Sequence, residues 1–321
     1  MKIATVLLRA AGALAALPVL AGAATAQMEL KILAPAAPGG GWDQTARGMQ
    51  SAMVASGAAK SVQVVNVPGA GGTVGLAQLV NSAKGDGNLL MVNGLVMVGA
   101  ILTNKSPVTL DKATPIARLT AEYLAIVVPA NSPLKDAAGL AALLKADPAK
   151  VIWAGGSAGG VDHIVAGLFT KAVGADPAKI NYIAYSGGGE ALAAMLGGKV
   201  TAGVSGYGEF ESQIKSGRLR VLALTAPARI PGVDAPTLKE QGVDLVIANW
   251  RSVMAAPGLT DDQKKALLAA VEKMAKSPAW ADVLKQKRWD DAYLAGDEFA
   301  AFLQSEQTRV AEVLKSIGLV K

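Results

Sequence analysis

A glycine-rich turn that recurs between an apolar run and an amphipathic run restricts the fold of this 321-residue chain more than any other feature. The turn occurs at residues 38–43 (PGGGWD), 68–73 (PGAGGT), 155–160 (GGSAGG) and 186–190 (SGGGE), with a looser fifth copy at 205–208 (SGYG). Val/Ile/Leu-rich runs before the turns indicate strands, and Ala/Leu-rich runs after them indicate helices. This alternation predicts an α/β protein with parallel sheets flanked by helices.

The expected elements follow from the same periodicity. Strands are predicted at residues 30–33, 62–67, 89–93, 125–129, 151–154, 181–185, 200–204, 221–225 and 250–255, and helices at 44–55, 73–81, 161–173, 190–196 and 210–215. Two long helices should follow. Thr260 is expected to cap the first, with Asp261 and Asp262 near its positive end, and Asp297 is expected to cap the last, which stops at Gly318.

The alternation restarts after residues 130–133 and changes again near residues 248–257. The sequence therefore predicts two α/β lobes joined by two crossings, near Val128 and near Asn249. Lobe 1 would comprise residues 27–128 plus 250–321, and lobe 2 residues 129–249.

The N-terminus has the composition of an export signal. Lys2 and Arg9 supply positive charge, residues 10–23 are apolar, and residues 24–26 (ATA) have the small-x-small pattern of a cleavage site. The apolar run is short for a membrane span. We predict that residues 1–26 are a removable signal peptide and that the mature protein is released into the periplasm.

Composition excludes several classes of protein. The chain has no cysteine, which excludes a lipoprotein anchor, disulfides, zinc–thiolate sites and a cysteine nucleophile. The formal charge of +6 includes the two cations of the leader, and Lys and Arg do not cluster, so nucleic-acid binding is not expected. One histidine without cysteine is a poor basis for a metal site.

The glycine-rich turns predict an anion site. A helix N-terminus offers unpaired N–H donors and partial positive charge, and glycine lets an anion approach the backbone. In open α/β sheets such turns gather at the carboxyl ends of the strands, where ligands bind. A single turn is compatible with a simple structural role, but several at equivalent positions favour an anion site shared by the two lobes.

Four side chains near these turns have two interpretations each. Asp43 and Glu190 either cap their helices or position a ligand, and capping is favoured for Glu190. Arg47 should pair with Asp43 across one helical turn, with a direct contact to the ligand as the less favoured interpretation. His163 is expected at the rim or between packed elements, with a role in the cleft as the second interpretation.

Two segments resemble motifs of enzymes. Residues 155–159 fit the G-x-S-x-G nucleophile elbow and make a serine hydrolase using Ser157 the main alternative. However, His163 lies on the helix that this elbow opens, whereas a hydrolase takes its histidine from a later loop. Residues 69–75 miss the dinucleotide fingerprint by one position, and no acidic residue follows at the required distance.

Longer motifs resemble the tripartite tricarboxylate transporter receptor family, also called the Bug family of periplasmic solute-binding proteins, and are most similar to its tricarboxylate-binding branch. The resemblance covers essentially the whole mature chain. It rests on residues 34–45 (APAAPGGGWDQT), 68–75, 114–120, 155–163, 182–198 and 249–251 (NWR).

The resemblance implies a two-lobed type II periplasmic-binding-protein fold that closes on its ligand, without catalysis or cofactor. It implies a small di- or tricarboxylate as ligand, the large and small membrane subunits of the transporter as partners, and a monomeric receptor. The implied ligand-binding residues are Ala36, Gly39, Gly41, Asp43, Gly71, Gly72, Thr73, Ser157, Gly159, Gly160 and Ser186. The Gly-Gly-Gly-Trp form of residues 39–42 is what points to a citrate-like ligand.

Overall fold

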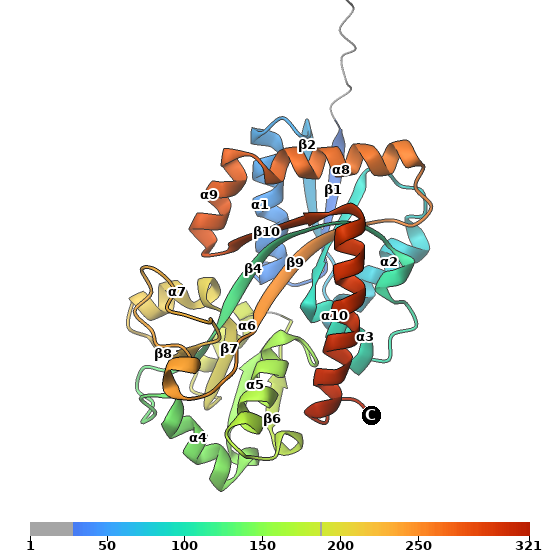
Figure 1. Cartoon of the computed structure of the whole chain (residues 1–321). Helices are drawn as coiled ribbons and strands as arrows, with labels where there is room; N and C mark the ends of the chain where they lie inside the picture. Colours follow the sequence, from blue (N-terminus) through green and yellow to red (C-terminus); the bar gives the residue numbers. More distant parts are fainter. Residues whose placement is uncertain (1–27, 187) are drawn as a thin grey trace, which may run out of the picture.

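The computed structural model describes residues 28–186 and 188–321, and that part of the chain forms ten strands and ten α-helices (Figure 1). The predicted signal peptide lies outside these residues. The strands are β1 (Glu29–Ala34), β2 (Ser61–Asn66), β3 (Leu89–Gly94), β4 (Thr114–Pro129), β5 (Ile152–Gly155), β6 (Asn181–Ala184), β7 (Ala202–Gly206), β8 (Leu219–Leu224), β9 (Ala248–Ala255) and β10 (Asp290–Ala295). The helices are α1 (Gly41–Ala55), α2 (Thr73–Ser82), α3 (Leu95–Thr103), α4 (Ala137–Ala146), α5 (Val161–Ala172), α6 (Gly188–Leu196), α7 (Tyr207–Lys215), α8 (Asp261–Ala275), α9 (Pro278–Lys287) and α10 (Gly296–Ser316).

The strands form two groups that share β4. In the first group, β1 is parallel to β2 and β3, and β9 runs antiparallel between β3 and β4. In the second group, β5 is parallel to β6 and β7, while β7 and β8 are antiparallel to β4. The parallel pairs β1–β2 and β5–β6 are each joined through a glycine-rich turn and a helix, as the alternating pattern predicted.

Strand β4 connects the two groups because it is 16 residues long. Its first part pairs with β9 and β10 as far as Tyr123, and its last part pairs with β7 and β8 from Leu124 onward. The sequence predicted only residues 125–129 of this strand, and it placed the first crossing near Val128. The proposed lobe boundaries stay a prediction.

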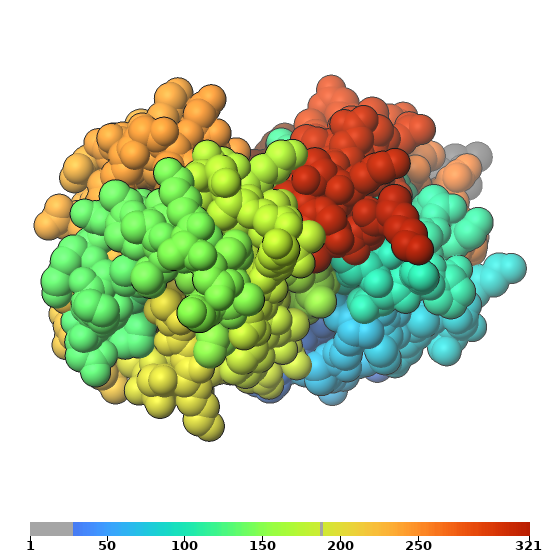
Figure 2. Space-filling view, turned by 90° about the horizontal axis from the view of Figure 1, so that it is seen from below, coloured from blue at the N-terminus to red at the C-terminus, as the bar shows by residue number. Residues whose placement is uncertain are grey.

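The two groups lie one above the other in Figure 1, with α8 and α9 covering the first and α4 and α5 flanking the second. Helix α10 descends along the first group and reaches α5. There Ile317 packs against Gly167, and Lys171 Nζ donates to Ser316 O at 3.3 Å. Figure 2 shows this C-terminal helix in red against the yellow-green segment of the second group.

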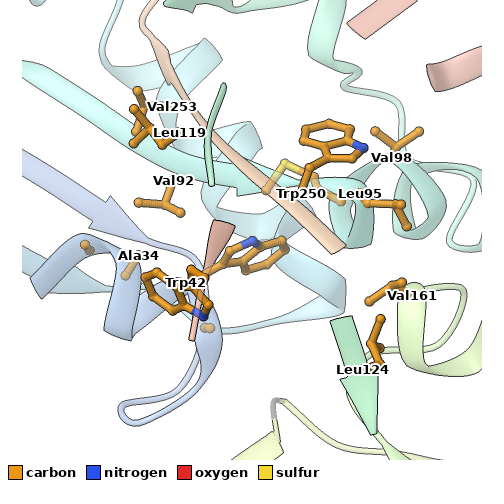
Figure 3. Packing of buried hydrophobic residues seen from close by; sticks show 14 of the residues in the cluster. Ala34, Trp42, Val92, Leu95, Val98, Leu119, Leu124, Val161, Trp250 and Val253 are labelled. Atoms are coloured by element: carbon orange, nitrogen blue, oxygen red, sulfur yellow. The ribbon is translucent and has the colours of Figure 1, made fainter. Parts of the chain in front are cut away.

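A large hydrophobic core continues across the junction of the two groups. Trp42, Trp250 and Leu95 of the first group and Leu124 and Val161 of the second group all belong to it (Figure 3). The glycine-rich turns are therefore held by packing on both sides.

Local signals at the helix ends gave one correct prediction and one wrong one. Thr260 caps α8 in a reciprocal capping box with Gln263, as its position indicated. Asp297 does not cap α10, because the N-cap is Ala295 and Asp297 already lies in the first turn. Its carboxylate is still favourably placed near the positive end of the helix.

In the described part of the chain, no helix has both the length and the apolar composition that crossing a membrane would need.

Candidate functional site

Two cavities lie where the five glycine-rich turns converge. The outer cavity, about 310 Å³, is lined by Pro35, Gly69, Ala70, Gly71, Gly72, Asn104, Ser157, Ala158, Ala184, Tyr185, Ser186 and Glu190. The inner cavity, about 50 Å³, is lined by Ala36, Gly41, Trp42, Val96, Gly156, Ser157, Val161, Asp162, Ser186, Ser205, Glu209, Asn249 and Arg251. Ser157 and Ser186 line both, so the two cavities adjoin at these residues.

The cavities bring together six of the eleven residues predicted for ligand binding. Ala36 and Gly41 line the inner cavity, Gly71 and Gly72 the outer cavity, and Ser157 and Ser186 both. The other five line neither cavity: Gly39, Asp43, Thr73, Gly159 and Gly160.

Asp43 stabilises the first glycine-rich turn, residues 38–43, through hydrogen bonds. Its Oδ2 accepts from Gly39 N at 2.9 Å and from Arg47 Nε at 3.0 Å, and its Oδ1 accepts from Asn66 Nδ2 at 2.9 Å. Burial by itself raises the pKa of Asp43, but the hydrogen bonds from Arg47 and Gly39 outweigh it and leave the pKa below its usual value. The predicted Asp43–Arg47 pair is confirmed, and the carboxylate holds the turn in shape.

The second turn needs glycine for two reasons. Gly71 and Gly72 have φ of 63° and 87°, in the left-handed region. A Cβ on Gly72 would also lie 2.7 Å from both the Trp42 ring and Met97. This turn approaches the turn at residues 155–160, since a Cβ on Gly71 would lie 3.3 Å from Ser157 Cβ.

Acidic side chains at the helix starts occupy some of the amides expected to bind an anion. Gly156 N donates to Asp162 Oδ2 at 2.7 Å, and Ser186 N donates to Glu190 Oε2 at 3.0 Å. Gly39 N donates to Asp43 in the same way, so at α1, α5 and α6 a backbone amide of the glycine-rich turn donates to an acidic side chain in the first turn of the helix. The capping role favoured for Glu190 is confirmed. The backbone amides of Gly39, Gly156 and Ser186 are therefore already engaged by acidic side chains of the protein.

His163 is packed between elements, as the first of its two interpretations held. Its ring stacks on Tyr182 at 4.0 Å between centroids, and its Nδ1 accepts from Gly159 N at 3.2 Å. Burial lowers the pKa of His163 to about 4. A histidine engaged in this way gives no support to the hydrolase interpretation of Ser157.

A cluster of buried charges lies at the floor of the inner cavity, where β4, β9 and α7 meet. Glu122 accepts from Arg251 Nη2, from Asn249 Nδ2 at 3.0 Å and from Trp289 Nε1 at 2.8 Å. The Arg251 guanidinium also lies 4.9 Å from the Trp289 ring centroid. These contacts satisfy both oxygens of Glu122.

Two further acids line the inner cavity, and Arg251 Nη2 lies 3.6 Å from Oε1 of one of them, Glu209. Burial raises the pKa of Asp162 to about 7, an effect that the Gly156 hydrogen bond reduces and the charge of Glu122 increases. Burial and the nearby Glu122 also raise the pKa of Glu209. The described residues contain no group of three or more candidate ligands that could hold a metal ion.

Glu122, Glu209 and Arg251 are not among the site residues predicted from the sequence. A signal was present, because Glu122 and Arg251 each interrupt an apolar strand run. A charge in a strand that pairs on both edges and is otherwise buried needs a partner or a ligand.

An α/β fold in which one long strand joins two groups of strands, with glycine-rich turns around a central hollow, is that of a periplasmic solute-binding protein. Residues 45–319 match the model of the tripartite tricarboxylate transporter family receptor, and the chain belongs to this family.

One relative is similar in sequence, and two solved structures are similar in fold. The protein BugT of Bordetella pertussis is 29% identical over 296 residues, covering 90% of this chain and 89% of BugT. The structure of MatC from Rhodopseudomonas palustris with bound malate has a TM-score of 0.78 at 23% identity, covering 89% and 99% of the two chains. R. palustris Rpa4515 with adipate has a TM-score of 0.81 at 20% identity, covering 91% and 97%.

Proposed function

We propose that this protein is an extracytoplasmic receptor that captures a small di- or tricarboxylate between its two lobes and delivers it to the membrane subunits of a tripartite tricarboxylate transporter. The family supports the receptor role, and malate and adipate in the two similar structures are dicarboxylates. A citrate-like acid and release of residues 1–26 as a signal peptide in the periplasm are parts of the same proposal.

The observation that carries the proposal is the position of Ser157 and Ser186 where the two cavities adjoin. Their hydroxyl groups can donate to ligand carboxylate oxygens, and Asn104 and Gly71 line the outer cavity opposite them. Residues from both proposed lobes, 27–128 plus 250–321 and 129–249, surround this space. A ligand touching both lobes would favour the closed state over the open one, which is the condition for a ligand-driven closure.

A screen of acids by thermal unfolding tests this function. The probes are citrate, isocitrate, tricarballylate, succinate, malate, glutarate and terephthalate. At a hundred times the dissociation constant, a true ligand should add about 2.7 kcal/mol to the free energy of unfolding. If no acid shifts the melting temperature, the proposed function is wrong.

The variant Ser157→Ala should weaken binding of whichever acid responds by about ten- to a hundredfold, because a hydrogen bond to a charged group is lost. Ser305→Ala, which removes an exposed hydroxyl on α10, is the matched control and should bind normally. The same pair decides the hydrolase alternative, since turnover of a chromogenic ester that Ser157→Ala abolishes would favour an enzyme.

A further inference from the structure

An ion pair outside both cavities links the two groups of strands at the end of α9 (Figure 1). Arg288 is the C-cap of α9, which packs against α1, α8 and β10 of the first group. Its Nε and Nη2 each lie 3.2 Å from Glu211 Oε1, and its Nη1 donates to Pro231 O at 3.3 Å. Glu211 lies on α7, which packs on β7 and β8 of the second group, and Pro231 follows β8.

The backbone of Arg288 has a conformation that arginine rarely adopts. Its φ of 59° and ψ of 37° lie in the left-handed region, where the residue that ends a helix is usually glycine or asparagine. Within the described part of the chain, every hydrogen bond of the Arg288 side chain goes to the second group. Contacts between the groups therefore offset the local cost of placing an arginine here.

Helices α9 and α7 approach each other so closely that a glycine is needed between them. A Cβ on Gly208, the second residue of α7, would lie 2.5 Å from Lys287 O at the end of α9. Gly208 belongs to the looser fifth turn, residues 205–208, but it lines neither cavity. This glycine instead allows the first group to reach Glu211.

The ion pair is only partly open to solvent. The side chains of Arg288 and Glu211 are 31% and 15% exposed. Burial by itself raises the pKa of Glu211, but hydrogen bonds from Lys215 and Arg288 outweigh it and leave the pKa below its usual value. Glu211 is therefore an anion at neutral pH and attracts the guanidinium across the junction.

We propose that Arg288 and Glu211 form a latch that is made in the closed state and broken in the open state, and that this latch raises the affinity for the ligand without touching it. The inference rests on the proposed function. Because β4 and β9 join the two groups, a hinge motion of these strands separates α9 from α7. A contact made in one state alone shifts the population toward that state, and the apparent affinity follows the closed fraction.

A double-mutant cycle on ligand affinity tests the latch. The variants are Arg288→Asn, Glu211→Ala and the two combined, and asparagine is chosen because it tolerates the left-handed backbone. Calorimetric titration uses the acid of the thermal screen that binds most tightly. Each single variant should raise its dissociation constant about two- to fivefold, and the double variant should raise it no further than one of the single variants does.

Arg229→Asn is the matched control. Arg229 Nε donates to Glu240 Oε1 at 2.8 Å, and both residues lie between β8 and β9, so this ion pair does not join the two groups. The control should bind the acid as the wild type does. Urea denaturation of the same proteins measures what each ion pair contributes to the free energy of unfolding.

The cycle separates a latch from a static contact. An ion pair of equal strength in both states cannot change the affinity, so additive or absent effects on the dissociation constant overturn the inference, even where the free energies of unfolding are coupled. Arg288→Gly and Glu211→Gln replace any variant that does not fold by circular dichroism. An acid that binds without coupling leaves the proposed function standing, whereas a screen in which no acid binds overturns both.

Discussion

Glu122 is held in the interior because three donors from distant parts of the chain meet at its carboxylate. Arg251 and Asn249 come from β9, and Trp289 lies just before β10. Removing one partner of such a buried pair is far more costly than removing a surface ion pair, since the other charge is left without compensation. The cluster therefore fixes the guanidinium of Arg251 at the floor of the inner cavity.

His163 provides a second test at the scale of single residues. It is the one histidine of the chain, and burial lowers its pKa to about 4. In the unfolded chain, His163 takes up a proton near pH 6.5, whereas in the folded protein it does so only near pH 4. Because the unfolded state therefore binds more protons between these pH values, the contribution of His163 to the free energy of unfolding is fully present above pH 6.5 and is lost as the pH falls towards 4.

We expect the free energy of unfolding of the wild type to fall, relative to His163→Gln, by up to about 3 kcal/mol between pH 7 and pH 4. Urea denaturation of both proteins across this range measures the difference. Asp162 and Glu209 titrate with the opposite sign, but they do so in both proteins and cancel. Parallel stability curves would show that His163 is not buried in its neutral form.

Among the elements, α3 and α5 approach each other closely because glycine lies at their contact. A Cβ on Gly99 of α3 would overlap the carbonyl oxygen of Gly159, just before α5. Thr103, one turn further along α3, donates through its hydroxyl to Ala158 O at 3.2 Å. This contact holds the turn that contains Ser157 against the first group of strands.

Gly99→Ala should destabilise the protein by about 1–3 kcal/mol, because the added methyl group forces the two backbones apart. It should also weaken ligand binding, since the Ser157 turn moves with them. Gly139→Ala in α4 is the control. There the new methyl group meets its nearest neighbour at an ordinary 3.4 Å, and alanine's better helix propensity should leave the protein unchanged or slightly more stable. Chemical denaturation of both variants measures their free energies of unfolding, which should fall in Gly99→Ala and stay equal or rise in Gly139→Ala.

For the whole molecule, β4 and β9 determine how the two groups of strands can move. Strand β4 passes through both groups, and β9 pairs with it along the first. The cavities lie on the side where the glycine-rich turns converge. We expect bending of these strands to open and close the site, with repacking of the part of the hydrophobic core that crosses the junction.

We expect the radius of gyration in solution to decrease when a saturating ligand is added, because the ligand favours the closed state. Small-angle X-ray scattering measures the change. An acid that gives no thermal shift should leave the radius unchanged and serves as the control. A constant radius with a ligand that does bind would contradict closure.

The local pattern of the chain was enough to predict most of the fold. Alternating apolar and amphipathic runs located β1, β2, β3, α1, α2 and α5 to within a few residues, because each has a clear periodicity and a glycine-rich boundary. Helix α3 was missed because it is apolar on nearly every side and follows β3 without a turn. Strand β10 was missed because its residues are mostly half-exposed and lack a β-rich apolar run.

The sequence by itself determined the strand–turn–helix order and the convergence of the turns, since both follow from local backbone preferences and from the rule that parallel strands end at the same edge. Only the tertiary structure decided which donors face a ligand. Asp162 and Glu190 cover amides of their own turns, and Glu122, Glu209 and Arg251 meet from three separate elements. Such contacts depend on how distant segments pack, and no local pattern encodes them.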